Sequence, residues 1–191
     1  GDVYKRQTQE LIAHLPLLVH PKPDSVLLIG LGSGVSLASA ETHDIKYIEC
    51  VELLENVIAA AHYYDDITRN SMDDPRARLI VGDGRNHVML TRRKYDVIIS
   101  QPTNPWISGV GDLFTLEFFS EASKRLKPGG VMCAWFQIYH MGERELRSVL
   151  KTFITVFPHA LLWFSNESDI VLIGSLSSIE IDDDFVARMQ A

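Results

Sequence analysis

The sequence has few cysteines and no excess of basic residues, and each shortage excludes a class of protein. Its two cysteines, Cys50 and Cys133, lie in apolar runs, so we expect buried thiols of a reducing compartment rather than a disulfide framework or a metal site. Lys and Arg number 18 against 25 Asp and Glu, which gives a net charge of −7. That balance argues against a nucleic-acid-binding surface and suits a cationic substrate.

Long apolar runs are also lacking. A membrane helix needs roughly 18 consecutive apolar residues, and the nearest stretch, 25–40, is interrupted by three glycines. No signal peptide is recognisable, so we expect a cytoplasmic domain. The chain starts with Gly rather than Met, and residues 1–9 are expected to be an assembly scar or the remnant of a missing N-terminal region. Residues 10–191 then form one domain, a fragment of a longer protein.

What the sequence does contain is an ordinary globular composition, 46% hydrophobic and 23% charged, in which apolar β-rich runs alternate with amphipathic stretches. This alternation is typical of a parallel sheet covered on both faces. Because the last two runs are close together, they predict an antiparallel hairpin. The predicted strands are 25–30, 45–51, 77–81, 95–100, 130–136, 161–165 and 170–174.

Apolar residues at helical spacing follow several of these strands. The helix before residue 127 is expected to stop at a tight turn over 127–130, and a later helix stops at Pro158. Together these elements predict an α/β fold, the Rossmann-like fold of AdoMet-dependent transferases, with a mostly parallel seven-stranded sheet and a C-terminal hairpin. The three apolar stripes are Val57, Ala61 and Tyr64; Phe114, Phe118, Ala122 and Leu126; and Leu146, Val149, Leu150, Phe153, Ile154 and Phe157.

A glycine loop follows the first predicted strand. Gly30, Gly32 and Gly34 allow a tight turn and a close approach of the backbone to a ligand. The dinucleotide pattern would need a third glycine where Val35 stands, so the spacing disfavours NAD and favours an AdoMet-type nucleoside.

Two carboxylates follow the next two strands. Glu52 ends the second strand, where it can accept hydrogen bonds from both hydroxyls of a ribose. Asp83, followed by Gly84, comes just after the third strand, where it can accept from an adenine amino group. Three strand ends that meet at one edge of the sheet would form a nucleoside pocket.

The fourth strand leads into Gln101-Pro102-Thr103-Asn104-Pro105-Trp106, followed by a glycine-rich stretch that could act as a lid. With this segment the resemblance becomes specific: the chain resembles the spermidine synthase family, the polyamine aminopropyltransferases, and most of all its bacterial spermidine synthase-like members. The residues that carry the resemblance are 10–16, the glycine loop, Val51-Glu52, Asp74-Pro75-Arg76, Gly82-Asp83-Gly84, segment 101–106, 113–118 and 126–130.

The resemblance implies decarboxylated AdoMet as co-substrate, transfer of its aminopropyl group to a polyamine such as putrescine, and methylthioadenosine as product, without a metal. Glu52 would hold the ribose and Asp83 the adenine. Segment 101–105 would be the catalytic stretch D-S-[ST]-D-P of the family, which makes Thr103 a candidate site residue. The family also implies a homodimer and, in some members, a membrane-spanning region elsewhere in the full-length protein.

Several positions depart from the family pattern. Gln101 replaces the carboxylate that orients the amine and accepts its proton, and an amide cannot be a base. Asn104 replaces the second acid of the motif, and Ser33 an Asp of the glycine loop. Thr8-Gln9 stands where the family has Tyr-His, and the family's N-terminal β-hairpin is not seen. The nucleoside end is retained and the amine end is altered.

Asp112 is a candidate substitute base, although by default it would cap the helix starting near Leu113. Tyr139 and His140 could line the pocket, whereas His14 and His20 are expected to be structural. Three functions stay open: an aminopropyltransferase-like enzyme, an AdoMet-dependent methyltransferase on the same fold, and a nucleoside-binding module without catalysis.

Overall fold

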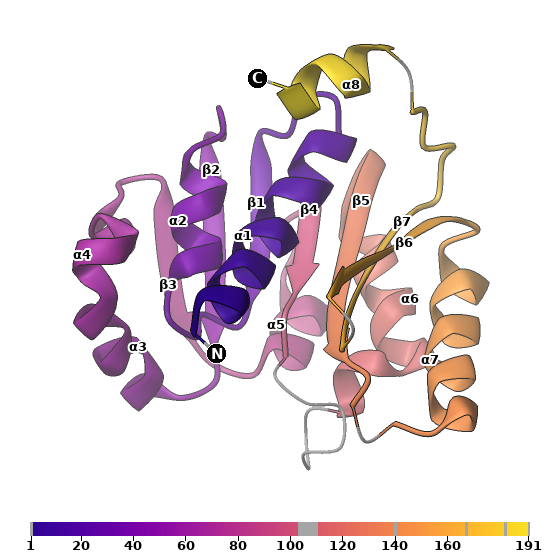
Figure 1. Cartoon of the computed structure of the whole chain (residues 1–191), viewed down its shortest axis with the longest axis horizontal. Coiled ribbons are helices and arrows are strands. Elements are labelled where there is room, and N and C mark those ends of the chain that lie inside the picture. Colours follow the sequence, from indigo (N-terminus) through magenta and orange to yellow (C-terminus); the bar gives the residue numbers. More distant parts are fainter. Residues whose placement is uncertain (1, 103–110, 140, 167, 182, 191) are drawn as a thin grey trace.

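A seven-stranded sheet runs through the molecule, with helices against both faces (Figure 1). The computed structural model describes residues 2–102, 111–139, 141–166, 168–181 and 183–190. The strands are β1 (Ser25–Ile29), β2 (Tyr47–Glu52), β3 (Ala77–Val81), β4 (Tyr95–Ser100), β5 (Leu126–Gln137), β6 (His159–Asn166) and β7 (Asp169–Ser175). The α-helices are α1 (Asp2–Val19), α2 (Val35–Glu41), α3 (Glu55–Ala61), α4 (Asp65–Thr68), α5 (Gly84–Leu90), α6 (Leu116–Lys124), α7 (Glu143–Val156) and α8 (Asp183–Gln190), and the 3-10 helices are η1 (His62–Tyr64), η2 (Ser71–Asp73) and η3 (Gly111–Phe114).

The strand order is β3-β2-β1-β4-β5-β7-β6, and only β7 runs against its neighbours. All seven predicted strands exist, and the last two form the expected antiparallel hairpin. The predicted AdoMet-dependent transferase fold is thereby confirmed. Consecutive parallel strands are joined by helical crossovers, so the loops that follow β1 to β4 all emerge at one edge.

The start of β5 differs from the prediction. The strand begins at Leu126, so residues 127–130 lie within it instead of forming a tight turn between helix and strand. Tyr95 pairs with Leu126, whereas Val97 already pairs with Val131. The extra residues of β5 therefore form an irregularity in the ladder. Gly129 permits it because its φ of 76° suits glycine.

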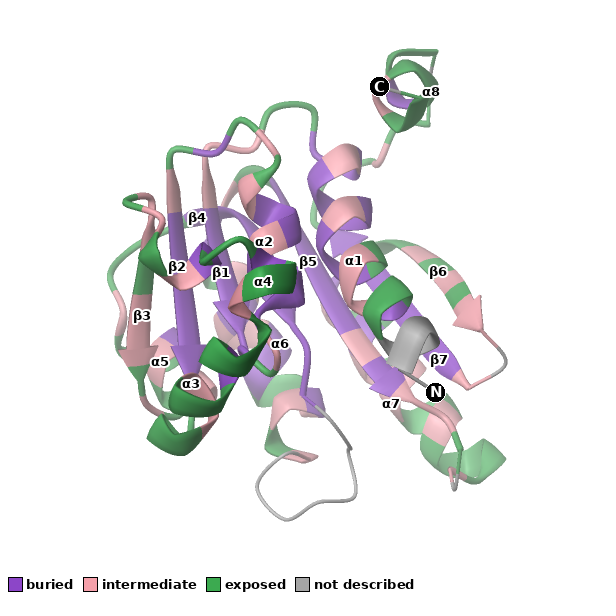
Figure 2. Ribbon diagram, turned by 60° about the vertical axis from the view of Figure 1, so that its left-hand side comes forward, coloured by how far each residue is buried: buried purple, intermediate pink, exposed green. Residues whose placement is uncertain are grey.

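Two hydrophobic cores lie on opposite faces of the sheet. Residues of α1, α2 and α8 build one core, and residues of α5, α6 and α7 build the other. Figure 2 shows the buried residues concentrated along the strands and on the helix sides that face them. Cys50 and Cys133 belong to the first core as free, buried thiols, as predicted, and burial raises the pKa of each thiol.

Of the residues in the predicted apolar stripes, seven are buried, four are half-buried and two are exposed. Tyr64 is exposed because the helix over 55–61 passes into the 3-10 helix η1, which changes the periodicity. Ile154 in α7 is 53% exposed, while its neighbour Phe153 is fully buried. The prediction from spacing that Ile154 belongs to the buried stripe is therefore wrong.

Helix α1 includes most of the segment expected to lie outside the domain. It starts at Asp2, so the boundary expected between residues 9 and 10 lies inside a helix. Thr8, although in that segment, is buried against the rest of the fold. Across the part of the chain that is described, no helix is both long and apolar enough to cross a bilayer.

Candidate nucleoside and amine site

The predicted site residues meet at the carboxyl edge of the parallel strands. The glycine loop follows β1, Glu52 ends β2, Asp83 comes two residues after β3, and Gln101 follows β4 directly. Because these four strands are neighbours in the order β3-β2-β1-β4, the residues form a row along one edge. Such an edge is where open α/β sheets bind their ligands.

The glycine loop adopts a backbone that side chains would resist. Gly30, Gly32 and Gly34 have φ values of 94°, 56° and 82°, a region that favours glycine. A side chain at Gly30 would also approach the carbonyl oxygen of Gln101 to 3.2 Å. The loop therefore needs its glycines for its own geometry as well as for any ligand.

Glu52 holds the loop in place. Its side chain is buried, with 8% exposure. Oε2 accepts a hydrogen bond from the Leu31 amide at 2.9 Å, and Oε1 accepts from the Leu54 amide at 3.1 Å. Each carboxylate oxygen can accept a second bond, so the group keeps acceptor capacity for two hydroxyls while the protein fixes its orientation.

Gln101 is buried and hydrogen-bonded at both ends of its carboxamide. Nε2 donates to the Gly30 carbonyl and Oε1 accepts from Ser36 Oγ, each at 2.6 Å. Its backbone amide continues the sheet by donating to the Ile29 carbonyl at 3.0 Å. At the position where the family pattern has its carboxylate, Gln101 thus holds the glycine loop, and its amide cannot take a proton.

Helix α1 closes the other side of this loop. Ser33 Oγ donates to Gln9 Oε1 at 2.9 Å, and Ser36 Oγ lies 3.0 Å from the Gln9 carbonyl. Ser33 is therefore engaged by the protein itself. Gln9 was noted only as a departure from the family pattern. Ser36 was not singled out, since a polar residue inside a helical stretch gives no signal of its own.

Asp83 has a structural partner as well. It is the N-cap of α5, and its Oδ1 accepts from the Asn86 amide at 2.8 Å. Its second oxygen remains an acceptor. Gly84 packs closely, because a Cβ there would lie 2.3 Å from Ile29 Cγ2. This contact gives Gly84 a packing reason in addition to the predicted ligand contact.

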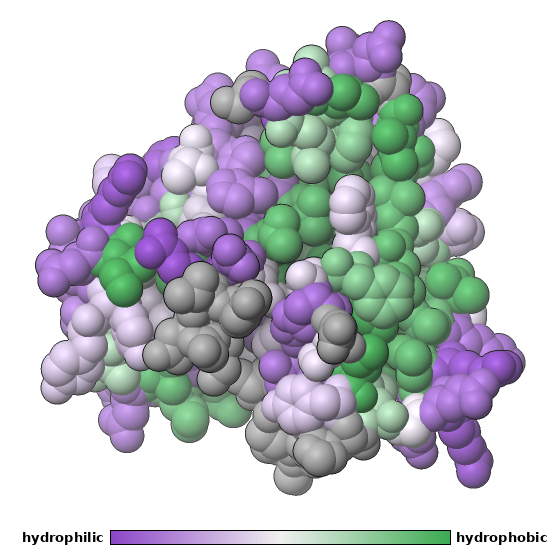
Figure 3. Space-filling model, in the orientation of Figure 1, coloured by the Kyte–Doolittle hydropathy of each residue, from purple (hydrophilic) through white to green (hydrophobic). Residues whose placement is uncertain are grey.

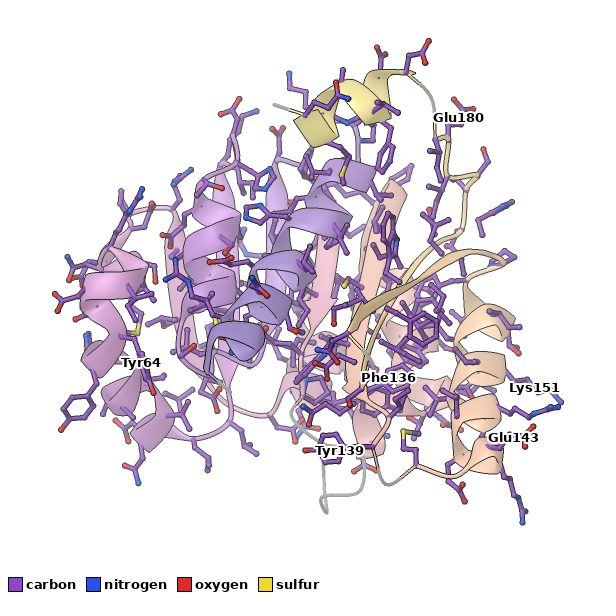
Figure 4. All side chains as sticks on the ribbon, in the orientation of Figure 1. Tyr64, Phe136, Tyr139, Glu143, Lys151 and Glu180 are labelled. Atoms are coloured by element: carbon purple, nitrogen blue, oxygen red, sulfur yellow. The ribbon has the colours of Figure 1, made fainter. Side chains whose placement is uncertain are left out.

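The segment after Pro102 is described only in part. Thr103 and Asn104, like His140, lie outside the described residues. Asp112 is exposed in η3 and does not cap the next helix. Thr115 is that cap, accepting from the Phe118 amide at 3.2 Å. Tyr139 lies just beyond the end of β5 at this same edge (Figure 4).

His14 and His20 fit the predicted structural roles. His14 Nδ1 lies 2.8 Å from His43 Nε2, and His20 Nδ1 accepts from the Lys22 amide at 3.2 Å. Burial lowers the pKa of each imidazole. Neither residue is at the carboxyl edge.

A hollow on the surface lies elsewhere. About 670 Å³ of space is lined by Glu49, His87, Arg78, Arg92 and Arg93, near the amino ends of β3 and β4. It contains none of the predicted site residues. The candidate site is the row of strand ends, where open α/β sheets bind their ligands, and this hollow lies apart from it.

Comparison with known proteins establishes the family of this chain. Residues 5–165 match the profile of the spermine/spermidine synthase domain. The chain belongs to the spermine/spermidine synthase family. It is 34% identical over 167 residues to the polyamine aminopropyltransferase of Thermotoga neapolitana, an alignment that covers 80% of this chain and 56% of that protein. The chain thus spans about half the length of the curated relatives it matches.

Solved structures of the spermine/spermidine synthase family share the fold. A spermidine synthase in complex with the transition-state analogue AdoDATO superposes with a TM-score of 0.83 at 30% identity, covering 95% of this chain and 64% of that one. Human methyltransferase-like protein 13 in complex with SAH gives a TM-score of 0.73 at 20% identity, over 100% of this chain and 90% of that one. The second likeness concerns the fold alone.

Proposed function

We propose that this chain is an aminopropyltransferase domain that binds decarboxylated AdoMet and transfers its aminopropyl group to a polyamine. Family membership supports the reaction class, and the position of Glu52 is the observation that carries the nucleoside site. Its buried carboxylate is fixed by two backbone amides at the end of β2 and keeps acceptor capacity for a ribose. Asp83 and the glycine loop lie on either side of it and would contact the adenine and the sulfonium end.

The reaction requires a neutral amine. The nitrogen lone pair attacks the aminopropyl carbon bonded to the sulfonium sulfur, and a C–N bond forms as the C–S bond breaks. The electron pair passes to sulfur, which leaves as the thioether of methylthioadenosine, and the new ammonium then loses a proton. An alkylammonium resembles Lys, with a pKa near 10.4, so only about one amine group in 2,500 is neutral at pH 7.

As part of this proposal we expect slow turnover, because Gln101 stands where the family pattern has a carboxylate. With both ends of its carboxamide engaged, it neither binds a proton nor carries a negative charge toward the amine. We expect the rate at limiting amine to rise about tenfold per pH unit between pH 7 and 9, following the neutral amine. A plateau near neutral pH would instead reveal a protein base, for which Asp112 is the first residue to test.

A second candidate function is nucleoside binding without catalysis, which the same environment of Gln101 favours. Gln101→Asp tests it, because Asp supplies a carboxylate, which has no N–H group to donate to the Gly30 carbonyl and is therefore not held there as Gln101 is. Product formation from decarboxylated AdoMet and putrescine is measured for both proteins. Methylthioadenosine formed only by the variant would assign the natural chain to binding alone.

The nucleoside site is tested by thermal shift and calorimetry with decarboxylated AdoMet, methylthioadenosine, AdoMet and S-adenosylhomocysteine. A ligand at 100 times its Kd adds about 2.7 kcal/mol, or roughly 5–10 °C in melting temperature for a chain of this size. Glu52→Gln should weaken binding about tenfold or more, and Glu55→Gln, exposed on α3, should not.

Each pattern of binding has a different meaning. The proposal is supported if the wild type binds decarboxylated AdoMet and methylthioadenosine and Glu52→Gln binds them more weakly. Binding of AdoMet and S-adenosylhomocysteine alone, with S-adenosylhomocysteine as the product, would replace it with methyl transfer. Unchanged affinity in Glu52→Gln would show that Glu52 does not hold the nucleoside.

A further inference from the structure

Asp169 is a buried carboxylate that the described chain satisfies only in part. It is the first residue of β7 and 7% exposed. Oδ2 accepts from Asn166 Nδ2 at 2.6 Å and from Thr8 Oγ1 at 3.4 Å. Oδ1 is also buried but has no hydrogen-bond partner among the described residues, and none of their cationic side chains forms an ion pair with Asp169. A buried charge without a counter-ion is costly unless a ligand uses it.

The orientation of Asn166 is set by a second contact. Its Oδ1 accepts from the Ser168 amide at 2.7 Å, which leaves the Nδ2 amino group facing Asp169. Asp169 thus has two neutral donors on Oδ2 and no donor from the described residues on Oδ1. An ammonium group that takes the place of the Asn166 amide would reach both oxygens and supply the missing positive charge.

Asp169 lies at the same edge of the sheet as Gln101. It pairs with Gln137, the last residue of β5, and β5 separates β4 from β7. Two strand spacings of about 4.8 Å put the chain at Asp169 roughly 10 Å from β4 across the sheet. Because side chains alternate, Asp169 shares its face with Val171, and Val171 belongs to the core covered by α1.

Helix α1 connects the two positions through consecutive residues. Thr8 contacts Asp169, and the Gln9 carbonyl lies within 3.0 Å of Ser36 Oγ, which in turn contacts Gln101. Thr8 and Gln9 occupy the two positions where the family pattern has Tyr-His. Thr8 is smaller than Tyr, and its hydroxyl contacts Asp169, a carboxylate that the family motifs do not include.

Two tryptophans complete the surroundings. Trp135 of β5 and Trp163 of β6 both pair with Val171, two residues from Asp169 and on the same face. Their indole Nε1 groups are buried without a partner among the described residues, so three polar atoms in this region are unsatisfied. Indole faces attract alkylammonium groups and cover methylene chains. Figure 3 shows that this side of the molecule carries more hydrophobic surface than the side of α3 and α4.

We propose that Asp169, with Thr8, Asn166, Trp135 and Trp163, forms a subsite for the charged end of a diamine or polyamine acceptor. The proposal rests on the proposed aminopropyl transfer and names its specificity-determining residue. The acceptor's far ammonium group binds Asp169 while its neutral nitrogen lies toward Gln101. Asp169 thereby supplies the acidic contact that the altered segment 101–106 no longer offers.

The test compares wild type, Asp169→Asn and Glu143→Gln, the last an exposed carboxylate on α7. Each protein is titrated calorimetrically with methylthioadenosine, and then, loaded with it, with 1,4-diaminobutane. We expect Asp169→Asn to bind methylthioadenosine as wild type does and 1,4-diaminobutane at least about tenfold more weakly. Glu143→Gln should match wild type in both titrations.

Thermal denaturation without ligand separates this role from a structural one. A ligand-binding carboxylate that is unsatisfied in the free protein predicts an equal or higher melting temperature for Asp169→Asn, whereas a structural carboxylate predicts a lower one. If the variant does not fold, Trp163→Phe replaces it, and weaker diamine binding is again expected because Trp is the stronger cation–π partner.

The outcomes distinguish the two proposals. Unchanged diamine affinity in Asp169→Asn, or wild type that binds methylthioadenosine but not the diamine, overturns the Asp169 subsite and leaves the nucleoside site standing. Wild type that binds neither compound overturns the proposed function and the subsite with it. Loss of diamine binding alone, at unchanged nucleoside affinity, supports the subsite.

Discussion

Gly130 shows how closely a single position is packed in this fold. A Cβ added there would lie 2.8 Å from the Lys127 carbonyl oxygen and 3.0 Å from Leu126 Cβ, and backbone atoms cannot move aside as a side-chain end can. We predict that Gly130→Ala lowers the free energy of unfolding by about 1–3 kcal/mol. Urea denaturation measures this value.

Gly82 provides the matched control. A Cβ there would meet nothing within 4 Å, so Gly82→Ala should change the free energy of unfolding by less than about 1 kcal/mol. Equal losses in the two alanine variants would contradict the packing argument, because they would point to a cost shared by any side chain at these glycines.

The sequence identified polar residues of the site but not their hydrogen-bond partners. Glu52 and Gln101 were identified from their places after strands, and both lie at the expected edge. Their partners, the Leu31 amide and Ser36 Oγ, were not identified, because they come from distant parts of the chain. Whether an acid caps a helix, as Asp83 does, or binds a ligand as well depends on such partners.

At the scale of elements, one face of α7 packs against the core, and we expect that face to contribute most of the stability that the helix adds. Phe153 is fully buried, with its ring 5.1 Å from that of Phe119 in α6, while Ile154 is 53% exposed. We predict that Phe153→Ala costs about 3–5 kcal/mol of unfolding free energy, whereas Ile154→Ala costs less than about 1 kcal/mol. Thermal or urea denaturation of both variants checks this, and similar losses would mean that α7 is oriented differently.

Local sequence predicted the elements better than their boundaries. The helical periodicity identified the buried stripe of α7 but assigned Ile154 to it, since a residue one position from Phe153 falls near the border of an apolar face. The start of β5 was placed at residue 130 because Pro and Gly usually mark turns. The ladder with β4 instead extends the strand back to Leu126, a pairing that local sequence does not show.

At the scale of the whole molecule, stability should depend on pH through a histidine pair that joins α1 to the loop before β2. Burial, and then the charge of His14, lower the pKa of His43 to about 4, against an ordinary value near 6.5. The unfolded chain therefore binds the proton more readily. The contribution of His43 to stability is complete above about pH 6.5 and is lost as the pH falls toward 4.

The contribution of Glu41 to stability changes with pH in the opposite direction. Burial, and then the charge of Asp74, raise its pKa to about 8. Its contribution is complete below about pH 4.5 and is lost as the pH rises toward 8. His43→Gln should therefore flatten the acid side of the stability profile, and Glu41→Gln the neutral side. Urea denaturation from pH 4 to 8 measures both profiles, and variants that run parallel to wild type would refute the assignment.

The sequence alone determined the order of the elements, the class of fold and the row of strand-end residues, because hydrophobic period, glycine spacing and strand ends are local properties. Only the tertiary structure decided which polar atoms pair. It showed that Gln101 braces the glycine loop and that α1 continues through residues 2–9. It also placed Asp169 of the last strand beside Thr8 near the start of the chain. These contacts join residues up to 161 positions apart, and the packing of α1 across the sheet brings them together.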